Sequence, residues 1–390
     1  MTSRTRLSVL LISTPVLAFV VVGGLLGKAS TGDATFQHLR VFEDVVSLIL
    51  NNYVEDAKID RVMEGAMRGL ADGLDPDSAY LNPAQTKQVE SGERLAAGDV
   101  GIELTRQYYL RVIAARDGSP AAKAGLHTGD YVRAIDGKPT RDLSVFEGMR
   151  ILRGAPGTKV ALTVIRGNAA EPRQIDLVRE KTPGAVVTGR MLPPDIGYIR
   201  VATFGTGAAD KIHSQVDELT RTGATNLIID LRHTAEGPFE TGLEAARLFV
   251  KSGALAIVAG RDQEVKRETI SAKPGDGAIA LPVTLLVTTG TSGAAELFAA
   301  ALDGNKRADL VGERTLGRAG IQKLVHLPDG RGLWLTHARY LTPNGDAIQG
   351  KGLNPDLEVD EPETDFGEPA PAKDPILDAA IDRIHKKVAA

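Results

Sequence analysis

Two stretches near the start of the chain place apolar residues at helical spacing. In residues 36–56 the apolar positions recur every three or four residues, a period that predicts an amphipathic helix. A second helix is predicted over residues 60–74, and Pro76 ends it because proline cannot continue a helix. The two elements define an N-terminal helical region, for which we set the boundaries 34–95.

Between residues 98 and 180 the pattern changes to short β-rich runs separated by glycine and proline turns. One helix-like stretch, residues 143–152, lies among these runs. About six short strands with one or two helices predict a small barrel-like module. We place its boundaries at residues 96–182.

From residue 196 onward, apolar strands alternate with amphipathic helices. The strands are predicted at 196–204, 226–232 and 283–289, and the helices at 208–222, 239–250 and 293–304. Strands that are apolar along their whole length are typical of a buried, mostly parallel sheet with helices packed on it. The pattern therefore predicts an α/β domain over residues 183–358.

The chain ends in a polar segment and a last amphipathic helix. Residues 359–374 hold six acidic residues, one lysine and three prolines, a composition that predicts a disordered linker. A helix follows over residues 375–390. Its apolar stripe either docks onto its own domain or forms an oligomer contact. The stripe consists of Leu377, Ile381, Ile384 and Val388.

An uncharged apolar run near the N-terminus departs from the pattern of a soluble chain. Residues 7–27 follow Arg4 and Arg6, and these 21 residues would span about 30 Å as a helix, enough to cross a membrane. Because GKAS (27–30) is a poor signal-peptidase site, we expect an uncleaved transmembrane anchor. The basic N-terminus predicts a single pass through a bacterial inner membrane, with the bulk of the chain periplasmic or extracytoplasmic.

Composition excludes several classes of function. The formal net charge is −4, so nothing favours nucleic acid as a partner. The chain has no cysteine, which excludes disulfides and thiolate metal sites. The seven histidines show no metal-ligand spacing, and no phosphate-binding glycine loop is present, so we expect no metal and no cofactor.

Several stretches occur in an order that resembles one known family. They include NNYVED (51–56), GLADGLDPDSAYLNP (69–83), GSPAAKAGLHTGDYVRAIDGKPT (118–140), NKRADLVGERTLGRAGIQ (305–322) and ARYLTPNGDAIQGKGLNPDLEV (338–359). The chain thereby resembles the carboxyl-terminal (tail-specific) processing serine peptidases. The resemblance implies an α/β protease core of the ClpP/crotonase-like type, with an inserted PDZ domain and an N-terminal helical region. The predicted transmembrane helix completes the fold class that we expect.

The resemblance to PDZ domains implies a site for peptide C-termini. GDVGIEL (98–104) matches the loop and strand that receive the carboxylate in such domains. Backbone N–H groups of the loop would capture the carboxylate, and the peptide would add as a strand. The alternative is that the apolar side chains fill the domain core and the groove is closed. The peptide-binding residues implied are Val100, Gly101 and Ile102 in the loop and Val145 and Met149 on the facing helix.

The catalytic run of the family is degenerate in this chain. Family members carry a serine nucleophile in the middle of an S-A-S-A-S-E run. Anchored on Glu296, the stretch GTSGAAE places Gly293 at that position. The family's lysine base falls on Arg318, and its supporting glutamine is kept as Gln322. Glycine has no hydroxyl to attack a carbonyl, and arginine stays protonated and cannot accept the hydroxyl proton.

A third departure concerns the oxyanion hole. Family members show an x-N-P-G-G run there, whereas this chain has HTAEGPF (233–239), with Glu236 at the first glycine and only Gly237 matching. A carboxylate would repel a developing oxyanion. The three departures predict a pseudoprotease that binds protein C-termini as a scaffold or regulator. The expected partners are protein or peptide C-termini, a second copy of the chain or an active protease, and the membrane through the N-terminal helix.

An active serine endopeptidase with a rearranged site is the alternative. GTSGA resembles a nucleophile elbow with Ser292 as nucleophile, and His233 at the end of its strand would be the base. No acidic partner for His233 is evident in the sequence. The competing interpretation makes Ser292 a helix N-cap and Arg318 a carboxylate-binding residue, with Glu236 or Glu296 as its partner.

Overall fold

The computed structural model describes residues 36–92, 95–167, 169, 171–261, 266–362, 364–366 and 371–388. The predicted anchor, residues 7–27, lies outside this set. Within the set, no helix is long and apolar enough to cross a membrane. The chain divides into two compact units after Leu70.

The described part of the first unit is helical. Residues 36–52 form one helix and α2 (Ile59–Asp72) a second, which confirms the two helices predicted from the apolar spacing. Most apolar side chains of the first helix are exposed, so it buries little apolar surface among the described residues. The exposed ones are Phe36, Leu39, Val41, Val45, Leu48, Ile49 and Leu50.

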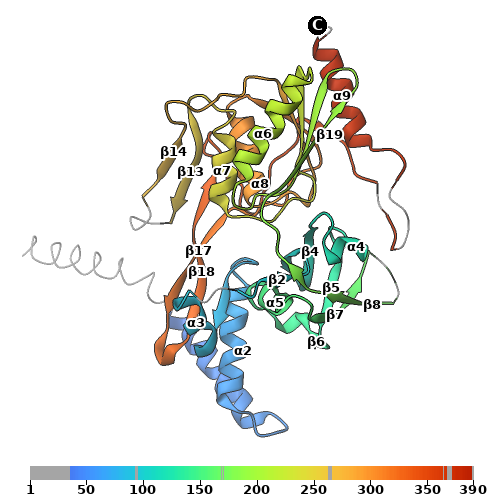
Figure 1. Cartoon of the computed structure of the whole chain (residues 1–390). Helices are drawn as coiled ribbons and strands as arrows, with labels where there is room; N and C mark the ends of the chain where they lie inside the picture. The colour runs from blue at the N-terminus through green and yellow to red at the C-terminus, as the bar shows by residue number, and fades with distance from the viewer. Residues whose placement is uncertain are drawn as a thin grey trace, which may run out of the picture. The chain divides into compact units, whose positions relative to one another are not determined.

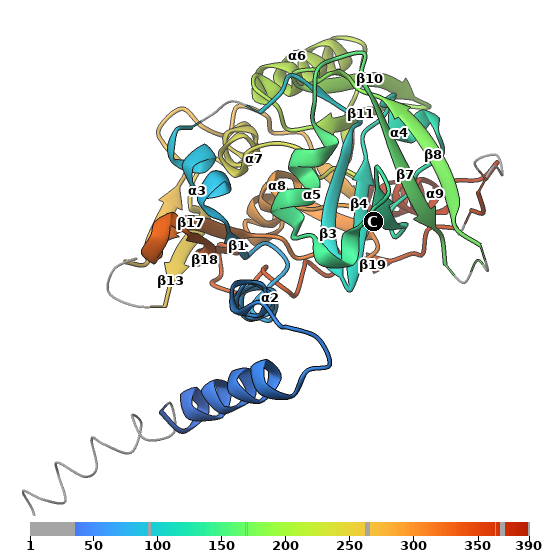
Figure 2. The ribbon, with the colours of Figure 1, turned by 90° about the horizontal axis from the view of Figure 1, so that it is seen from below.

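In the second unit, the small β-rich module forms over the predicted residues. Its antiparallel sheet has the order β3-β4-β5-β7-β8. Helix α5 (Val145–Leu152) lies beside β3 (Figure 2) and begins with a capping box in which Ser144 and Glu147 each bond the other's backbone N–H. The remaining elements are β2 (Gly98–Asp99), β3 (Ile102–Gln107), β4 (Tyr109–Ala115), α4 (Pro120–Lys123), β5 (Tyr131–Ile135), β6 (Lys138–Pro139), β7 (Lys159–Ile165), β8 (Arg173–Val178) and β9 (Glu180–Lys181).

The α/β domain is built on a six-stranded sheet with the order β10-β11-β12-β15-β16-β19. All neighbouring pairs from β11 to β19 are parallel, and β10 is antiparallel, which confirms the predicted mostly parallel sheet. The strands are β10 (Val186–Leu192), β11 (Ile196–Thr203), β12 (Asn226–Asp230), β15 (Val283–Val287), β16 (Ala308–Gly312) and β19 (Leu357–Glu358).

Helices cover both faces of this sheet (Figure 1). Because strand side chains alternate between faces, Ile199 and Ile229 point to the large core beneath α6 (Ala208–Arg221), α7 (Phe239–Ala246) and α8 (Ala294–Gly304). Ile196 and Ile228 point to the other face, where α9 (Pro375–Val388) packs.

A second sheet was not predicted. It has the order β1-β18-β13-β14, and β17 pairs with β18. Three residues of the N-terminal region, β1, pair with β18 about 250 positions later. Its strands are β1 (Ala79–Leu81), β13 (Ala254–Gly260), β14 (Glu268–Ser271), β17 (Gly320–His326) and β18 (Gly332–Leu341), and the helix α3 (Pro83–Glu90) follows β1.

The C-terminal helix docks onto its own domain. Ile376, Ala380 and Ile384 of α9 are buried against the sheet, so the predicted stripe is offset, with Leu377 and Ile381 only partly buried. The described part of the preceding acidic segment makes specific contacts. Its Glu361 bonds His233, its Phe366 ring lies 3.8 Å from the Arg166 guanidinium, and its Asp374 pairs with Arg232 at 2.8 Å. The prediction of a disordered linker is therefore wrong for these residues.

Candidate functional site

The turn between β15 and α8 presents a glycine where the nucleophile is expected. Gly293 directly precedes α8 and has φ 64° and ψ −122°, a backbone conformation that favours glycine. A Cβ built there meets nothing nearer than the Ala235 oxygen at 3.7 Å and the Phe239 ring at 3.8 Å. The position has space for a side chain, but it supplies none.

Glu296 joins the two halves of the site. Its buried carboxylate accepts hydrogen bonds from the backbone N–H groups of Gly293 at 3.2 Å, Gly317 at 2.6 Å and Arg318 at 2.8 Å. The Thr315 hydroxyl donates a fourth at 2.5 Å. Burial raises the pKa of Glu296, and the four donors offset part of that rise. The nucleophile and base positions therefore adjoin, as the family resemblance implies.

Arg318, at the base position, binds two carboxylates. Its guanidinium lies 2.9 Å from Asp77 and 3.3 Å from Glu103 of the small β-rich module. A carboxylate-binding role was predicted, but with other partners. Glu236 pairs with a different arginine, Arg116. Glu296 bonds the backbone N–H of Arg318 and not its guanidinium. Burial raises the pKa of Glu103 to about 7, although Arg318 lowers it.

Gln322 belongs to a polar cluster on the second sheet. Its side-chain amide donates to the Thr336 hydroxyl at 3.1 Å, and that hydroxyl donates to Asp75 at 3.2 Å. The cluster links β17 and β18 to the turn after α2. Gln322 thus has a structural role in addition to its position in the inherited motif.

The loop after β12 carries Glu236 and Gly237. A Cβ at Gly237 would lie 2.3 Å from the Phe204 carbonyl oxygen, so only glycine fits there. The Glu236 carboxylate accepts from Arg116 at 2.6 Å, and the same guanidinium bonds Asp99 at 2.9 Å. Glu236 is therefore paired with Arg116 and is not the free charge that the prediction of a repelled oxyanion assumed.

The structure supports neither interpretation of Ser292. Its hydroxyl is fully buried and has no hydrogen-bond partner among the described residues, so it neither pairs with His233 nor caps α8. His233 instead contacts Thr128 of the β-rich module at 2.8 Å and Glu361 at 2.9 Å. The acidic partner that the sequence did not show is therefore Glu361.

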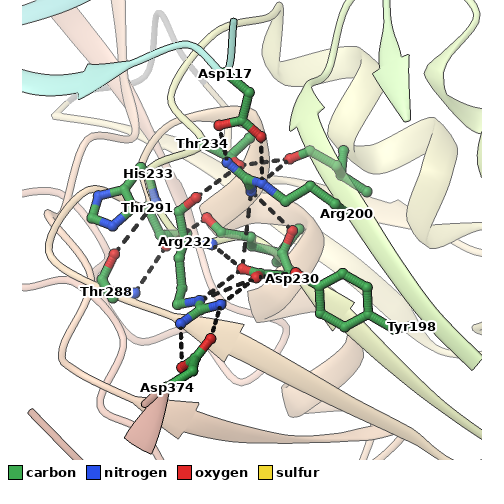
Figure 3. A network of polar contacts seen from close by, with 12 residues as sticks. Asp117, Tyr198, Arg200, Asp230, Arg232, His233, Thr234, Thr288, Thr291 and Asp374 are labelled. Carbon is green, nitrogen blue, oxygen red and sulfur yellow. Dashed lines mark hydrogen bonds and ion pairs between the residues drawn. The ribbon is translucent and has the colours of Figure 1, made fainter. Parts of the chain in front are cut away.

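A buried charge network lies at the carboxyl ends of β11 and β12 (Figure 3). Asp230 accepts from Arg232, which also pairs with Asp374 of the tail, and Arg200 pairs with Asp117 of the β-rich module. Burial alone would raise the pKa of Asp230, but the two arginines lower it below its ordinary value. Within the described ranges, no group of three or more His, Asp or Glu side chains is arranged to hold a metal ion. The network was not predicted from the sequence, because Asp117 and Asp374 lie 83 and 142 positions from the arginines that they bind.

The PDZ loop and helix α5 border a small hollow. A Cβ at Gly101 would lie 2.3 Å from the Ser119 Cβ, so the loop requires glycine. Among the described strands, β3 pairs with β4 alone, and its other edge has no strand. Val145 is buried in the PDZ core and does not line the hollow, contrary to the prediction. The lining residues are Asp99, Val100, Gly101, Ile102, Glu103, Arg116, Met149, Leu152, Arg153 and Glu236.

Known proteins share both parts of this arrangement. Residues 195–359 match the peptidase family S41 model, and residues 111–166 match a PDZ domain model. The carboxy-terminal-processing protease of Bartonella bacilliformis is 30% identical over 334 residues, which cover 84% of this chain and 76% of that protein. The carboxyl-terminal-processing protease of Synechocystis sp. is 32% identical over 322 residues, 81% of this chain and 75% of that protein. Among solved structures, a photosystem II D1 C-terminal processing protease is similar with a TM-score of 0.66 and 29% identity, over 80% of this chain and 85% of that one.

Proposed function

Because the chain belongs to the carboxyl-terminal processing peptidases of family S41, we propose that it is a catalytically inactive member that binds protein C-termini through its PDZ domain. The observation that carries this proposal is the pair of residues at the nucleophile and base positions. Gly293 has no hydroxyl, and the hydroxyl of the neighbouring Ser292 is buried without a hydrogen-bond partner among the described residues.

The environment of Arg318 supports the loss of activity. A Ser–Lys dyad needs an amine that is neutral when the hydroxyl proton leaves. Burial alone would lower the pKa of Arg318, but the carboxylates of Asp77 and Glu103 raise it above its ordinary value. A group held charged by two carboxylates cannot act as the base.

The PDZ domain supplies the binding activity in this proposal. The Gly101 loop and the edge of β3 are suited to a peptide C-terminus that adds as an extra strand beside α5. Apolar lining by Met149 and Leu152 favours an apolar last residue. The chain would then act as a scaffold or regulator, with a second copy or an active protease among its partners.

We further propose that residues 7–27 anchor the chain in a bacterial inner membrane with the rest outside the cytoplasm. The support is the uncharged run between basic residues. Fractionation with protease protection of the intact cell tests this topology. Recovery of the full chain in the soluble cytoplasmic fraction would refute it.

The test of function uses the purified full chain and an unfolded protein that ends in apolar residues. Binding that depends on the free C-terminus, without cleavage, is the expected result. Cleavage that persists after purification and disappears in Ser292→Ala would show instead that the chain is an active endopeptidase. A Ser214→Ala variant is the control, because that serine is exposed on α6, whereas Ser292 is buried.

A further inference from the structure

Two of the positions at which the chain departs from the family pattern contact the PDZ domain. Arg318 pairs with Glu103 of β3, and Glu236 pairs with Arg116 at the end of β4. The residues that replace the family's base and oxyanion-hole glycine therefore also form ion pairs between the degenerate site and the PDZ domain. The second pair bears directly on ligand binding.

Arg116 lies at the carboxylate-binding loop. Its side chain is only 5% exposed, and its guanidinium comes within 3.2 Å of the place where a Gly101 Cβ would stand. It lines the same hollow as Val100 and Ile102. An arginine guanidinium is the side chain that best matches a carboxylate, because it can donate two parallel hydrogen bonds.

The Arg116 guanidinium already binds two carboxylates, those of Asp99 and Glu236, and they differ in burial and in their other partners. Asp99 is 10% exposed and also accepts from the Thr182 hydroxyl at 2.5 Å. Glu236 is 21% exposed and comes from the loop after β12. Burial alone would raise the pKa of Asp99, but Arg116 and Thr182 lower it, so Asp99 stays charged and bound. Glu236 is thus the more exchangeable of the two.

The Glu236 loop is held close to the PDZ domain by contacts other than this ion pair. Ala235 packs with Ile113 and Ala114 of β4 in an apolar cluster. The neighbouring His233 contacts Thr128 of the same domain. Because these contacts keep the loop in place, Glu236 is presented to Arg116 at a high effective concentration.

We propose that Glu236 is an internal competitor for the terminal carboxylate of a bound peptide, which must displace it from Arg116. The ligand class is a peptide or protein with a free C-terminal carboxylate. This inference rests on the proposed binding of C-termini. It assigns Glu236 and Arg116 as residues that set the affinity of the groove, apart from any role in hydrolysis.

The test measures binding of a short fluorescein-labelled peptide ending in Leu-Ala-Val to the full chain, by fluorescence anisotropy. Glu236→Gln removes the competing charge and leaves Arg116 paired with Asp99. We expect roughly fivefold tighter binding of the free acid, the size of a partly exposed ion pair. The C-terminal amide of the same peptide should bind both proteins equally weakly.

Glu180→Gln is the matched control, since Glu180 pairs with Lys123 on an exposed surface of the PDZ domain. It should leave both affinities unchanged. Equal binding of the free acid by the wild type and Glu236→Gln would overturn the inference while leaving C-terminal binding intact. An equal gain for the amide would overturn it too, because the competition would then not involve the carboxylate. No binding by any variant would refute the proposed function itself. Glu236→Ala provides a second variant with the same expectation.

Discussion

Glu103 provides a sharp test of how burial and ion pairing compete in this molecule. Its carboxylate lies 3.3 Å from Arg318, with a side chain that is only 20% exposed. Its pKa is raised from the ordinary 4.5 to about 7, because burial and the nearby Glu236 raise it by more than Arg318 lowers it. The burial penalty therefore exceeds the attraction of the arginine, as it often does for enclosed ion pairs.

The sign of the pH dependence follows from this shift. Between pH 4.5 and about 7 the folded chain holds a proton on Glu103 that the unfolded chain has lost, so stability falls as pH rises through this window. The full shift corresponds to about 3 kcal/mol, since one pKa unit is worth about 1.4 kcal/mol. The perturbation is Glu103→Gln, which imitates the protonated form at every pH.

Urea unfolding of the full chain at pH 5 and pH 8 measures the effect. The stability of Glu103→Gln relative to the wild type should grow by about 2 kcal/mol between these two pH values, because only the wild type ionises. Glu180→Gln, an exposed carboxylate in the same domain, should show no such growth. If the stability of Glu103→Gln relative to the wild type stays the same or falls between pH 5 and pH 8, the pKa of Glu103 is not raised by folding and the reasoning is refuted.

Three further substitutions have expected outcomes. Gly293→Ser combined with Arg318→Lys should give a folded protein that cleaves casein no faster than the wild type. The reason is that Asp77 and Glu103 would keep the new lysine protonated. Rapid cleavage of casein would contradict this. Gly101→Val should abolish peptide binding and lower the thermal midpoint of the PDZ domain. The φ of 74° at Gly101 and the clash with Ser119 both oppose a side chain there. Peptide binding by fluorescence anisotropy that is unchanged from the wild type would contradict this. Asp230→Asn should cost about 3 kcal/mol in urea unfolding by leaving buried arginines short of a partner, and a loss under about 1 kcal/mol would show that the network contributes little.

The sequence predicted the elements whose apolar pattern is local. The parallel strands and the helices that follow them appear near their expected positions. The strand β1 could not be read in this way, because its three residues become a strand only by pairing with β18. The extended state there is set by a distant partner and not by its own pattern.

In the candidate site too, the sequence predicted what a local motif shows and missed the contacts with distant residues. Alignment with a family motif located Gly293 and Arg318, and the structure brings both to one place through Glu296. The partners of Arg318 were missed because Glu103 lies 215 positions away, and no spacing rule connects the two. Val145 illustrates a smaller error, since one turn of separation on a helix does not decide which of two residues faces the groove.

The tail after β19 changes what counts as the minimal folding unit. It contacts the PDZ domain through Phe366 and the α/β domain through Glu361 and Asp374 before α9 covers one face of the sheet. A truncation after residue 359 would keep the whole segment that matches the peptidase family and still uncover Ile196 and Ile228. Such a fragment would expose a contiguous apolar surface and aggregate. The last helix is therefore part of the domain's core, although it lies beyond the segment that matches the peptidase family.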